Sequence, residues 1–150
     1  MARAIALSQQ GMRSNQGGPF GAVIVKDGQI IGEGHNQVTT TNDPTAHAEV
    51  VAIRQACANL NSFQLDGCEL YTSCEPCPMC LGAIYWARIE RMFYGNSQAD
   101  AAAIGFDDQF IYEEIGREMG DRRLPIIQFM RDEANAAFQE WAEKGDRVDY

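Results

Sequence analysis

Two short motifs constrain the fold of this 150-residue chain more than any other feature. The first is His-Ala-Glu at 47–49, and the second is Cys-Glu-Pro-Cys-Pro-Met-Cys at 74–80. The 26 residues between Glu49 and Pro76 accommodate one helix, one turn and one strand, which together make a crossover connection. Because each motif stands where we expect a helix to begin, this connection predicts two helix starts side by side at one edge of a sheet.

The residue types in these motifs fit a catalytic zinc site. Zinc prefers thiolate and imidazole ligands in a tetrahedral shell, and catalytic sites use three protein ligands and keep the fourth position for water. His47, Cys77 and Cys80 supply three such ligands. Cys77 and Cys80 are three residues apart and share one helix face, and the electropositive helix N-terminus favours their thiolate forms. The sequence therefore predicts Zn²⁺ as cofactor.

Glu49 lies two residues from His47, and side chains two apart on a helix point to opposite flanks. The two converge only on a metal that lies off the N-terminal end of the helix. Glu49 is then an acid/base beside the metal, as in the H-x-E…P-C-x-x-C pattern of zinc deaminases. Zinc lowers the pKa of bound water to about 7. We expect zinc-bound hydroxide to attack an amino-bearing ring carbon while Glu49 shuttles protons and ammonia leaves.

The cysteine pattern alone leaves other interpretations open. C-x-x-C is also typical of structural zinc knuckles and of redox pairs, and adding Cys74 gives a four-ligand site in a non-catalytic, zinc-stabilised interaction module. Such a module gives Glu49 no task, so we favour the enzyme. We expect Cys74, Cys57 and Cys68 to be small buried core residues. The odd total of five cysteines and their crowding oppose a disulfide framework.

Turn and cap signals divide the chain into alternating helices and strands. Asp27-Gly28 predicts a hairpin, and Asn42-Asp43-Pro44 predicts a helix start with Asp43 as N-cap. In the first helix we expect Ile5, Leu7 and Met12 to contact the core. The expected helices are 2–14, 44–60, 77–87, 108–117 and 131–144, and the expected strands are 21–26, 30–34, 68–73, 91–95 and 124–130. This order predicts one α/β domain, 1–150, with a five-stranded mixed sheet flanked by helices on both faces.

Charge and hydropathy limit the partners. Twelve basic and 21 acidic residues give a net charge of −9, and no Lys/Arg cluster of the kind that binds nucleic acid is present. The longest apolar runs, such as 81–87, are too short to cross a bilayer. The first residues lack a long apolar core followed by a small-residue cleavage site, so we expect no signal peptide. We expect a cytoplasmic protein with no nucleic-acid or membrane partner.

Four segments resemble the bacterial guanine deaminases of the cytidine deaminase superfamily. They are 17–28, 42–49, 73–88 and 105–108, and the resemblance runs from about Gly17 to Asp108. The His/Glu and Cys motifs are shared with other deaminases, whereas Tyr-Trp-Ala-Arg at 85–88, Gly-Phe-Asp-Asp at 105–108 and a terminal tyrosine point to guanine. The resemblance implies the cytidine deaminase-like α/β/α sandwich and hydrolysis of guanine to xanthine and ammonia.

The resemblance also implies residues that bind the purine base. Asn36 hydrogen-bonds the purine ring, Phe20 stacks on the base, Phe106 lines the pocket, Asp108 accepts hydrogen bonds from guanine, and Tyr150 closes the site. Guanine presents N–H donors that a carboxylate can accept. The family's homodimers exchange C-terminal segments, so Phe106, Asp108 and Tyr150 are candidates for the partner's active site.

Each of these assignments has a plainer alternative. Asn36 fits a turn, Phe20 the core, Asp107 and Asp108 a helix N-cap pair, and Tyr150 a frayed terminus. Trp86 fits the core or a dimer interface, and His35 fits a surface or turn position. Pocket shape also leaves cytosine, guanosine, pterin, aminotriazine and tRNA adenosine open as substrates.

Overall fold

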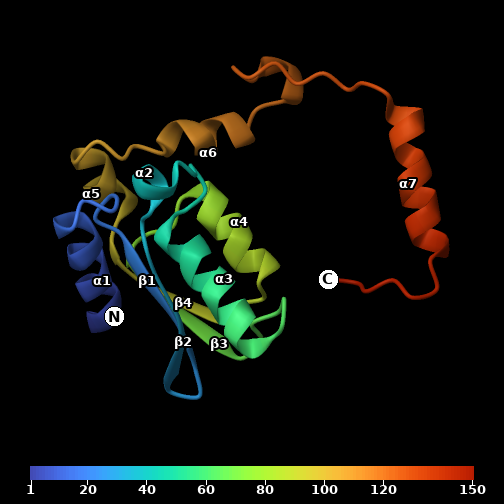
Figure 1. Cartoon of the computed structure of the whole chain (residues 1–150). Helices are drawn as coiled ribbons and strands as arrows, with labels where there is room; N and C mark the ends of the chain where they lie inside the picture. The colour runs from blue at the N-terminus through green and yellow to red at the C-terminus, as the bar shows by residue number, and fades with distance from the viewer. The chain divides into compact units, whose positions relative to one another are not determined.

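The centre of the fold is a four-stranded mixed sheet in the order β2-β1-β3-β4. The computed structural model describes residues 1–150. β1 runs antiparallel to both β2 and β3, whereas β3 and β4 are parallel and are joined by a helical crossover (Figure 1). The strands are β1 (Gly21–Lys26), β2 (Gln29–His35), β3 (Cys68–Cys74) and β4 (Arg91–Asn96).

Helices cover both faces of this sheet, as the alternation of side chains along β1 shows. Val23 packs against Ala4 and Leu7 of the first helix. Ala22 and Ile24 point the other way, into the main core cluster. The helices are α1 (Ala2–Arg13), α2 (Val38–Thr41), α3 (Ala48–Leu60), α4 (Pro78–Trp86), α5 (Gln98–Ala103), α6 (Gln109–Ile115) and α7 (Arg131–Glu143), with a 3-10 turn η1 at Met119–Asp121. The first helix therefore lies on one face, and α3 and α4 lie on the other.

The chain divides into two compact units, Met1–Gln109 and Phe110–Tyr150. The first unit contains the whole sheet and all of the buried residues. The second contains most of α6, together with η1 and α7, and none of its residues is buried. No helix in the chain has the length and apolar character needed to cross a bilayer.

The predicted fifth strand at 124–130 is wrong, because this segment contains no strand and the sheet has only four. A strand needs a neighbour to pair its backbone N–H and C=O groups, and this segment has no such neighbour. Its apolar side chains are exposed, Leu124 at 71% and Ile127 at 84%. A short apolar run alone does not distinguish a buried strand from a segment of another structure.

The helix predicted to begin at Pro44 begins at Ala48 instead, with His47 as its N-cap. Asp43 does act as a side-chain acceptor, but it closes a turn: its Oδ1 accepts from the backbone N and the Oγ1 of Thr45, at 2.8 and 2.7 Å. This turn carries the chain to His47 in an extended conformation. The short elements α2, α5 and η1 were not predicted.

The first helix lies where it was predicted, but its buried face differs. Leu7 is buried, whereas Ile5 and Met12 are exposed. The buried residues are Ala4, Leu7, Ser8 and Gly11, which follow the i, i+3, i+4, i+7 spacing of one helix face. Three of these residues are small, so the helix backbone lies close to the sheet.

Candidate active site

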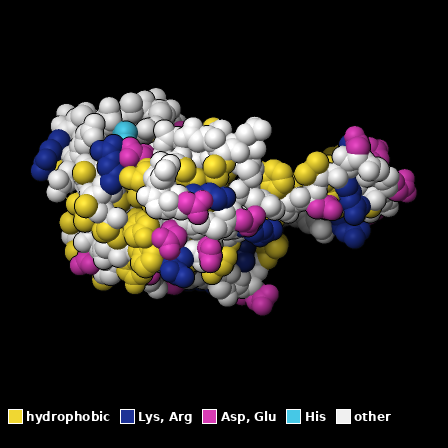
Figure 2. All heavy atoms as spheres, turned by 90° about the horizontal axis from the view of Figure 1, so that it is seen from below, with side chains coloured by type: hydrophobic (Ala, Val, Ile, Leu, Met, Phe, Trp, Pro, Cys, Tyr) yellow, Lys and Arg dark blue, Asp and Glu magenta, His cyan; other side chains and the backbone are white.

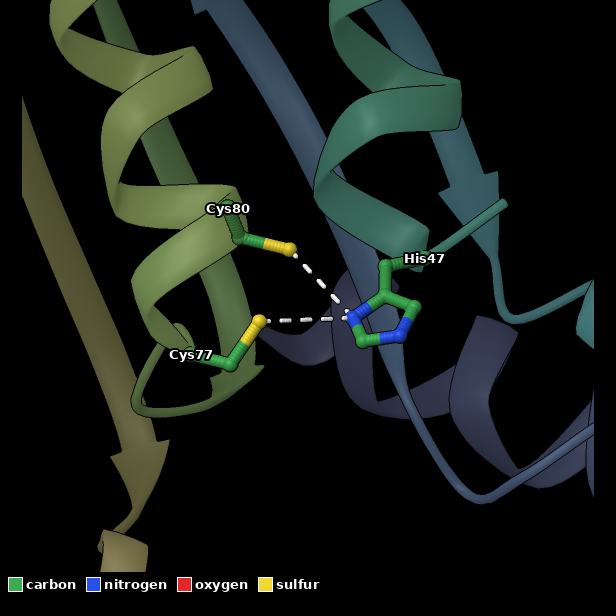
Figure 3. A group of neighbouring side chains, drawn as sticks. All are labelled: His47, Cys77 and Cys80. Carbon is green, nitrogen blue, oxygen red and sulfur yellow. Dashed lines mark hydrogen bonds between the residues drawn. The ribbon is translucent and has the colours of Figure 1, made fainter. Parts of the chain in front are cut away.

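Three side chains converge where the N-terminal ends of α3 and α4 meet: His47, Cys77 and Cys80 (Figure 3). His47 is the N-cap of α3 and Cys77 is the N-cap of α4, and both have extended backbones, with ψ of 156° and 168°. An N-cap residue has not yet entered the helix, so its side chain can reach beyond the helix end. Cys80 follows in the first turn of α4.

The distances among these side chains fit a tetrahedral zinc ion. His47 Nδ1 lies 3.6 Å from Cys77 Sγ and 3.4 Å from Cys80 Sγ, and all three ligand atoms lie within 4.8 Å of one another. Zn–S and Zn–N bonds of about 2.3 and 2.1 Å at a tetrahedral angle place nitrogen and sulfur about 3.5 Å apart. Two sulfurs and one imidazole nitrogen are also the ligand types that zinc prefers.

The hydrogen bond between Cys77 and Cys80 shifts the pKa values of the two thiols in opposite directions. A hydrogen bond from the Cys80 thiol lowers the pKa of Cys77 to about 4. The same hydrogen bond raises the pKa of Cys80, and the neighbouring Cys77 raises the pKa of His47. A thiolate already present beside a thiol and an imidazole can bind a divalent cation with the loss of one further thiol proton.

Glu49 lies in the first turn of α3, and only 5% of it is exposed. Thr72 Oγ1, from β3, donates a hydrogen bond of 2.9 Å to Glu49 Oε1. Burial raises the pKa of the Glu49 carboxyl above its usual value, and a hydrogen bond links it to Cys80. The structure therefore places a buried carboxyl group beside the three side chains that could hold a metal ion, with one of its oxygens bonded to threonine.

Asn36 follows β2 and is 5% exposed. Its Oδ1 accepts hydrogen bonds from the backbone N of Gly18, at 3.2 Å, and from that of Val38, at 3.3 Å. These two bonds use the acceptor atom of the amide and fix its orientation, and the Nδ2 group remains to donate. The predicted turn role is thus present, and it determines which end of the amide can meet a ligand.

Phe20 and Phe106 form an edge-to-face pair, with ring centroids 4.9 Å apart and an interplanar angle of 89°. A Cβ atom on Gly18 would lie 3.1 Å from both rings, so glycine leaves room for them. Phe20 also packs against the main core, while Phe106 is exposed. The contact joins the loop before β1 to the loop before α6 within one chain.

The two adjacent aspartates at 107 and 108 have different partners. Asp107 Oδ1 accepts from the backbone N of Gln109 at 3.0 Å, at the start of α6. Asp108 Oδ1 accepts from Gln98 Nε2 at 2.7 Å. Asp107 therefore closes a turn at the start of α6, and Asp108 is held by a side chain of α5.

The remaining singled-out residues lie as follows. Cys74 is buried outside the group of His47, Cys77 and Cys80. Its Sγ lies 3.7 Å from Ser97 O, and burial raises the pKa of its thiol to about 11.

His35 is not the predicted surface or turn residue: it ends β2 and is half-buried against Gly11. Trp86 is exposed at the end of α4, so it is not core. Tyr150 belongs to the second unit, and its role at the site stays a prediction.

Sequence reasoning missed Thr72 and Gln98, whose side chains bond to Glu49 and Asp108. One sequence feature could have pointed to Thr72. It is a hydroxyl residue in the alternating series Cys68, Leu70, Thr72 and Cys74, whose other members are apolar, in an expected strand. No such feature pointed to Gln98, because a glutamine near a helix start is ordinary.

Comparison with known proteins gives the following relationships. The family model for the cytidine and deoxycytidylate deaminase zinc-binding region matches residues 1–96. Guanine deaminase of Bacillus subtilis (strain 168) is 57% identical over 148 residues, 99% of this chain and 95% of that protein. The X-ray structure of guanine deaminase from Bacillus subtilis matches with a TM-score of 0.96 at 56% identity, covering 99% of this chain and 95% of that one. A tRNA-specific adenosine deaminase of Aquifex aeolicus is 53% identical over 76 residues, 51% of this chain and 50% of that protein.

Proposed function

Because this chain belongs to the cytidine and deoxycytidylate deaminase zinc-binding family, we propose that it is a guanine deaminase that converts guanine and water to xanthine and ammonia. The observation that carries this proposal is the 57% identity to a guanine deaminase over 99% of the chain. The similarity to the tRNA-specific enzyme covers only 51% of the chain.

We propose that Asn36, Phe20, Phe106 and Asp108 bind the base. The edge-to-face pair of Phe20 and Phe106 offers an apolar wall for a flat ring. Asp108 keeps acceptor capacity beyond its bond to Gln98 and can receive the N–H donors of guanine. Asn36 has its oxygen engaged, so it donates from Nδ2 to an acceptor on the purine. This set of one donor and one acceptor discriminates between bases by their hydrogen-bonding edges.

In the proposed mechanism His47, Cys77 and Cys80 would hold the zinc, which would supply a Lewis acid that lowers the pKa of water to about 7. Glu49 would accept a proton from the attacking water and pass it to the ring nitrogen next to the amino-bearing carbon. It then moves the second proton to the departing amine. Because Glu49 is buried, bulk water does not compete for these proton transfers.

We further propose a homodimer that exchanges C-terminal segments. None of residues 110–150 is buried, yet they include exposed large apolar side chains, among them Phe110, Ile127, Phe129 and Phe138. Figure 2 shows hydrophobic side chains at the surface in several places. Burial of such surface contributes about 25 cal/mol per Å². Phe106 and Asp108 have partners within their own first unit, so we assign only the segment after Gln109, with Tyr150, to the partner's site.

The proposed setting is the cytoplasm, and the proposed role is purine catabolism. The five free cysteines support a reducing compartment. The net charge of −9 speaks against tRNA as substrate, and basic and acidic side chains are interspersed on the face drawn in Figure 2. No membrane partner is proposed.

The test is ammonia release from guanine by the zinc-loaded protein, with Glu49→Gln as the blank. We expect ammonia that depends on Glu49 and xanthine in equal amount. Cytosine, guanosine, aminotriazines and a tRNA are assayed in parallel, and Glu49-dependent turnover of one of these without turnover of guanine replaces the substrate. A zinc shell of four sulfur and nitrogen ligands by X-ray absorption, with no turnover of any substrate, favours the non-catalytic module.

A further inference from the structure

Thr72 stands on a buried face of β3 that is otherwise apolar. Residues two apart in a strand share a face, so Thr72 lies with Cys68, Leu70 and Cys74. Cys68 and Leu70 belong to the main core, and Thr72 itself is 0% exposed. Its hydroxyl donates to Glu49 Oε1 at 2.9 Å, across 23 residues of sequence.

A hydroxyl at this position needs a reason. Burying one without a partner costs roughly 1–3 kcal/mol on protein scales, whereas valine has the same shape and no such cost. The hydroxyl proton has an acceptor in the carboxylate of Glu49. The threonine is therefore explained by its bond to Glu49 rather than by the packing of the core.

This bond fixes more than one atom. Glu49 lies in the first turn of α3, so the helix holds its backbone. A carboxylate is planar, so holding Oε1 from β3 also sets the direction of Oε2. Thr72 itself is fully buried and is not among the side chains that could hold a metal ion, so its hydroxyl acts through Glu49.

We propose that Thr72 is a positioning residue for Glu49: its hydroxyl holds Oε1 so that Oε2 stays oriented for proton transfer at the substrate. The inference rests on the proposed function for the identity of the reaction. The hydrogen bond and its effect on the placement of the Glu49 carboxylate do not depend on which base is deaminated.

Two pairs of variants isolate the hydroxyl in the zinc-loaded protein. Thr72 and Thr72→Val differ only in hydroxyl against methyl, and Thr72→Ser and Thr72→Ala differ only in the hydroxyl itself. We expect Thr72→Val and Thr72→Ala to lower kcat roughly 10- to 100-fold, the loss that follows removal of a hydrogen bond to a charged group. KM for guanine and zinc content stay within about twofold, because uniform binding is untouched. Thr72→Ser restores kcat to within about threefold of wild type.

Crystal structures of the valine and serine variants provide a readout that needs no turnover. We expect the Glu49 carboxylate to rotate away from its wild-type position in Thr72→Val and to keep it in Thr72→Ser. If the valine variant does not fold, the serine and alanine pair carries both measurements.

Three results overturn the inference: an unmoved carboxylate with unchanged kcat in the hydroxyl-free variants, an equal loss of kcat in Thr72→Ser, or a loss that tracks zinc content. Failure of the proposed function looks different. In that case wild type releases no ammonia from guanine, and the carboxylate positions in the two crystal structures still decide the role of Thr72.

Discussion

Cys80 and Cys74 are both buried thiols near the N-terminal end of α4, and only one of them meets His47. Cys80 Sγ lies 3.4 Å from His47 Nδ1, whereas Cys74 Sγ lies beside the carbonyl oxygen of Ser97. A catalytic site would use His47, Cys77 and Cys80, whereas a structural site would add the sulfur atom of Cys74 as a fourth ligand.

Substituting these cysteines one at a time therefore separates the two kinds of site. We expect Cys80→Ser to lower zinc affinity by at least about 100-fold, because a serine hydroxyl stays protonated at neutral pH. This loss exceeds the roughly 10- to 100-fold loss that follows mutation of a residue hydrogen-bonded to a metal ligand. Cys74→Ala is the matched control and keeps the zinc. Metal content after dialysis against a competing chelator measures both. Loss of zinc from Cys74→Ala would contradict the three-ligand site.

The neighbours Asp107 and Asp108 offer a second contrast between residues of the same type. Asp108→Asn keeps the shape and an acceptor for Gln98 but removes the charge, so we expect kcat/KM for guanine to fall roughly 10- to 100-fold. Asp107→Asn keeps a side-chain acceptor for the backbone N of Gln109, so we expect kcat/KM to stay nearly unchanged. Steady-state kinetics on the two purified variants decides, and equal losses would assign both residues to the helix start.

At the scale of the elements, the grouping of His47, Cys77 and Cys80 could be predicted because their spacing is local. Cys77 and Cys80 needed only the geometry of one helix, and the argument that His47 and Glu49 converge off a helix end holds for the observed N-cap position of His47. The bond from Thr72 to Glu49 spans 23 residues and the bond from Gln98 to Asp108 spans 10. Contacts of this kind depend on how elements pack, which no local pattern encodes.

The buried face of α1 and the start of α3 were misjudged for different reasons. Hydrophobicity favoured Ile5 and Met12, but the packing distance to the sheet selects the small residues Ala4, Ser8 and Gly11. Proline after aspartate is a good helix-start signal, yet the turn closed by Asp43 delays α3 by one turn. Packing against the sheet thus overrode hydrophobicity in α1, whereas at α3 one local signal, the turn closed by Asp43, overrode another.

Close packing between β2 and α3 places the N-cap His47, and Gly34 makes this packing possible. A Cβ atom at position 34 would lie 2.2 Å from the carbonyl oxygen of Ala48, the first residue of α3. We expect Gly34→Ala to push the helix start outward, to destabilise the protein by about 1–3 kcal/mol, as overpacking does, and to weaken zinc binding.

Gly82→Ala is the control for this substitution. No atom lies within 4 Å of a Cβ at position 82, in the middle of α4, so alanine should stabilise the helix by roughly 0.5–1 kcal/mol. Denaturant unfolding and zinc competition on both variants test the pair. Unchanged zinc affinity in Gly34→Ala would mean that the position of His47 does not depend on this contact.

For the whole molecule, the sequence analysis misjudged the apolar run at 124–130. The pattern fitted a fifth strand, but the structure has this segment exposed in a unit without buried residues. A single sequence cannot show whether an apolar segment is covered by its own chain or by a second copy, because both give the same composition. Exchange between subunits is therefore a prediction to be tested on the assembly.

Complementation between two defective subunits tests the exchange. One subunit carries Glu49→Gln and the other carries Tyr150→Ala, with different affinity tags, and mixed dimers are isolated by both tags in turn. If Tyr150 closes the partner's site, one site of each mixed dimer combines an intact Glu49 with an intact Tyr150, and the other combines both lesions. About half of wild-type activity is then expected, far above either parent dimer, because one site in two is intact.

Without exchange every site in a mixed dimer carries one lesion, so its activity stays at the level of the parents. That result would leave the catalytic assignment in place and contradict the swapped arrangement. Recovery of no mixed dimer from the second tag would contradict the homodimer itself. Full activity of the Tyr150→Ala parent would remove Tyr150 from the site, whatever the assembly. The experiment thus separates the three claims that the C-terminal segment carries, namely association, exchange and closure of the site by its last residue.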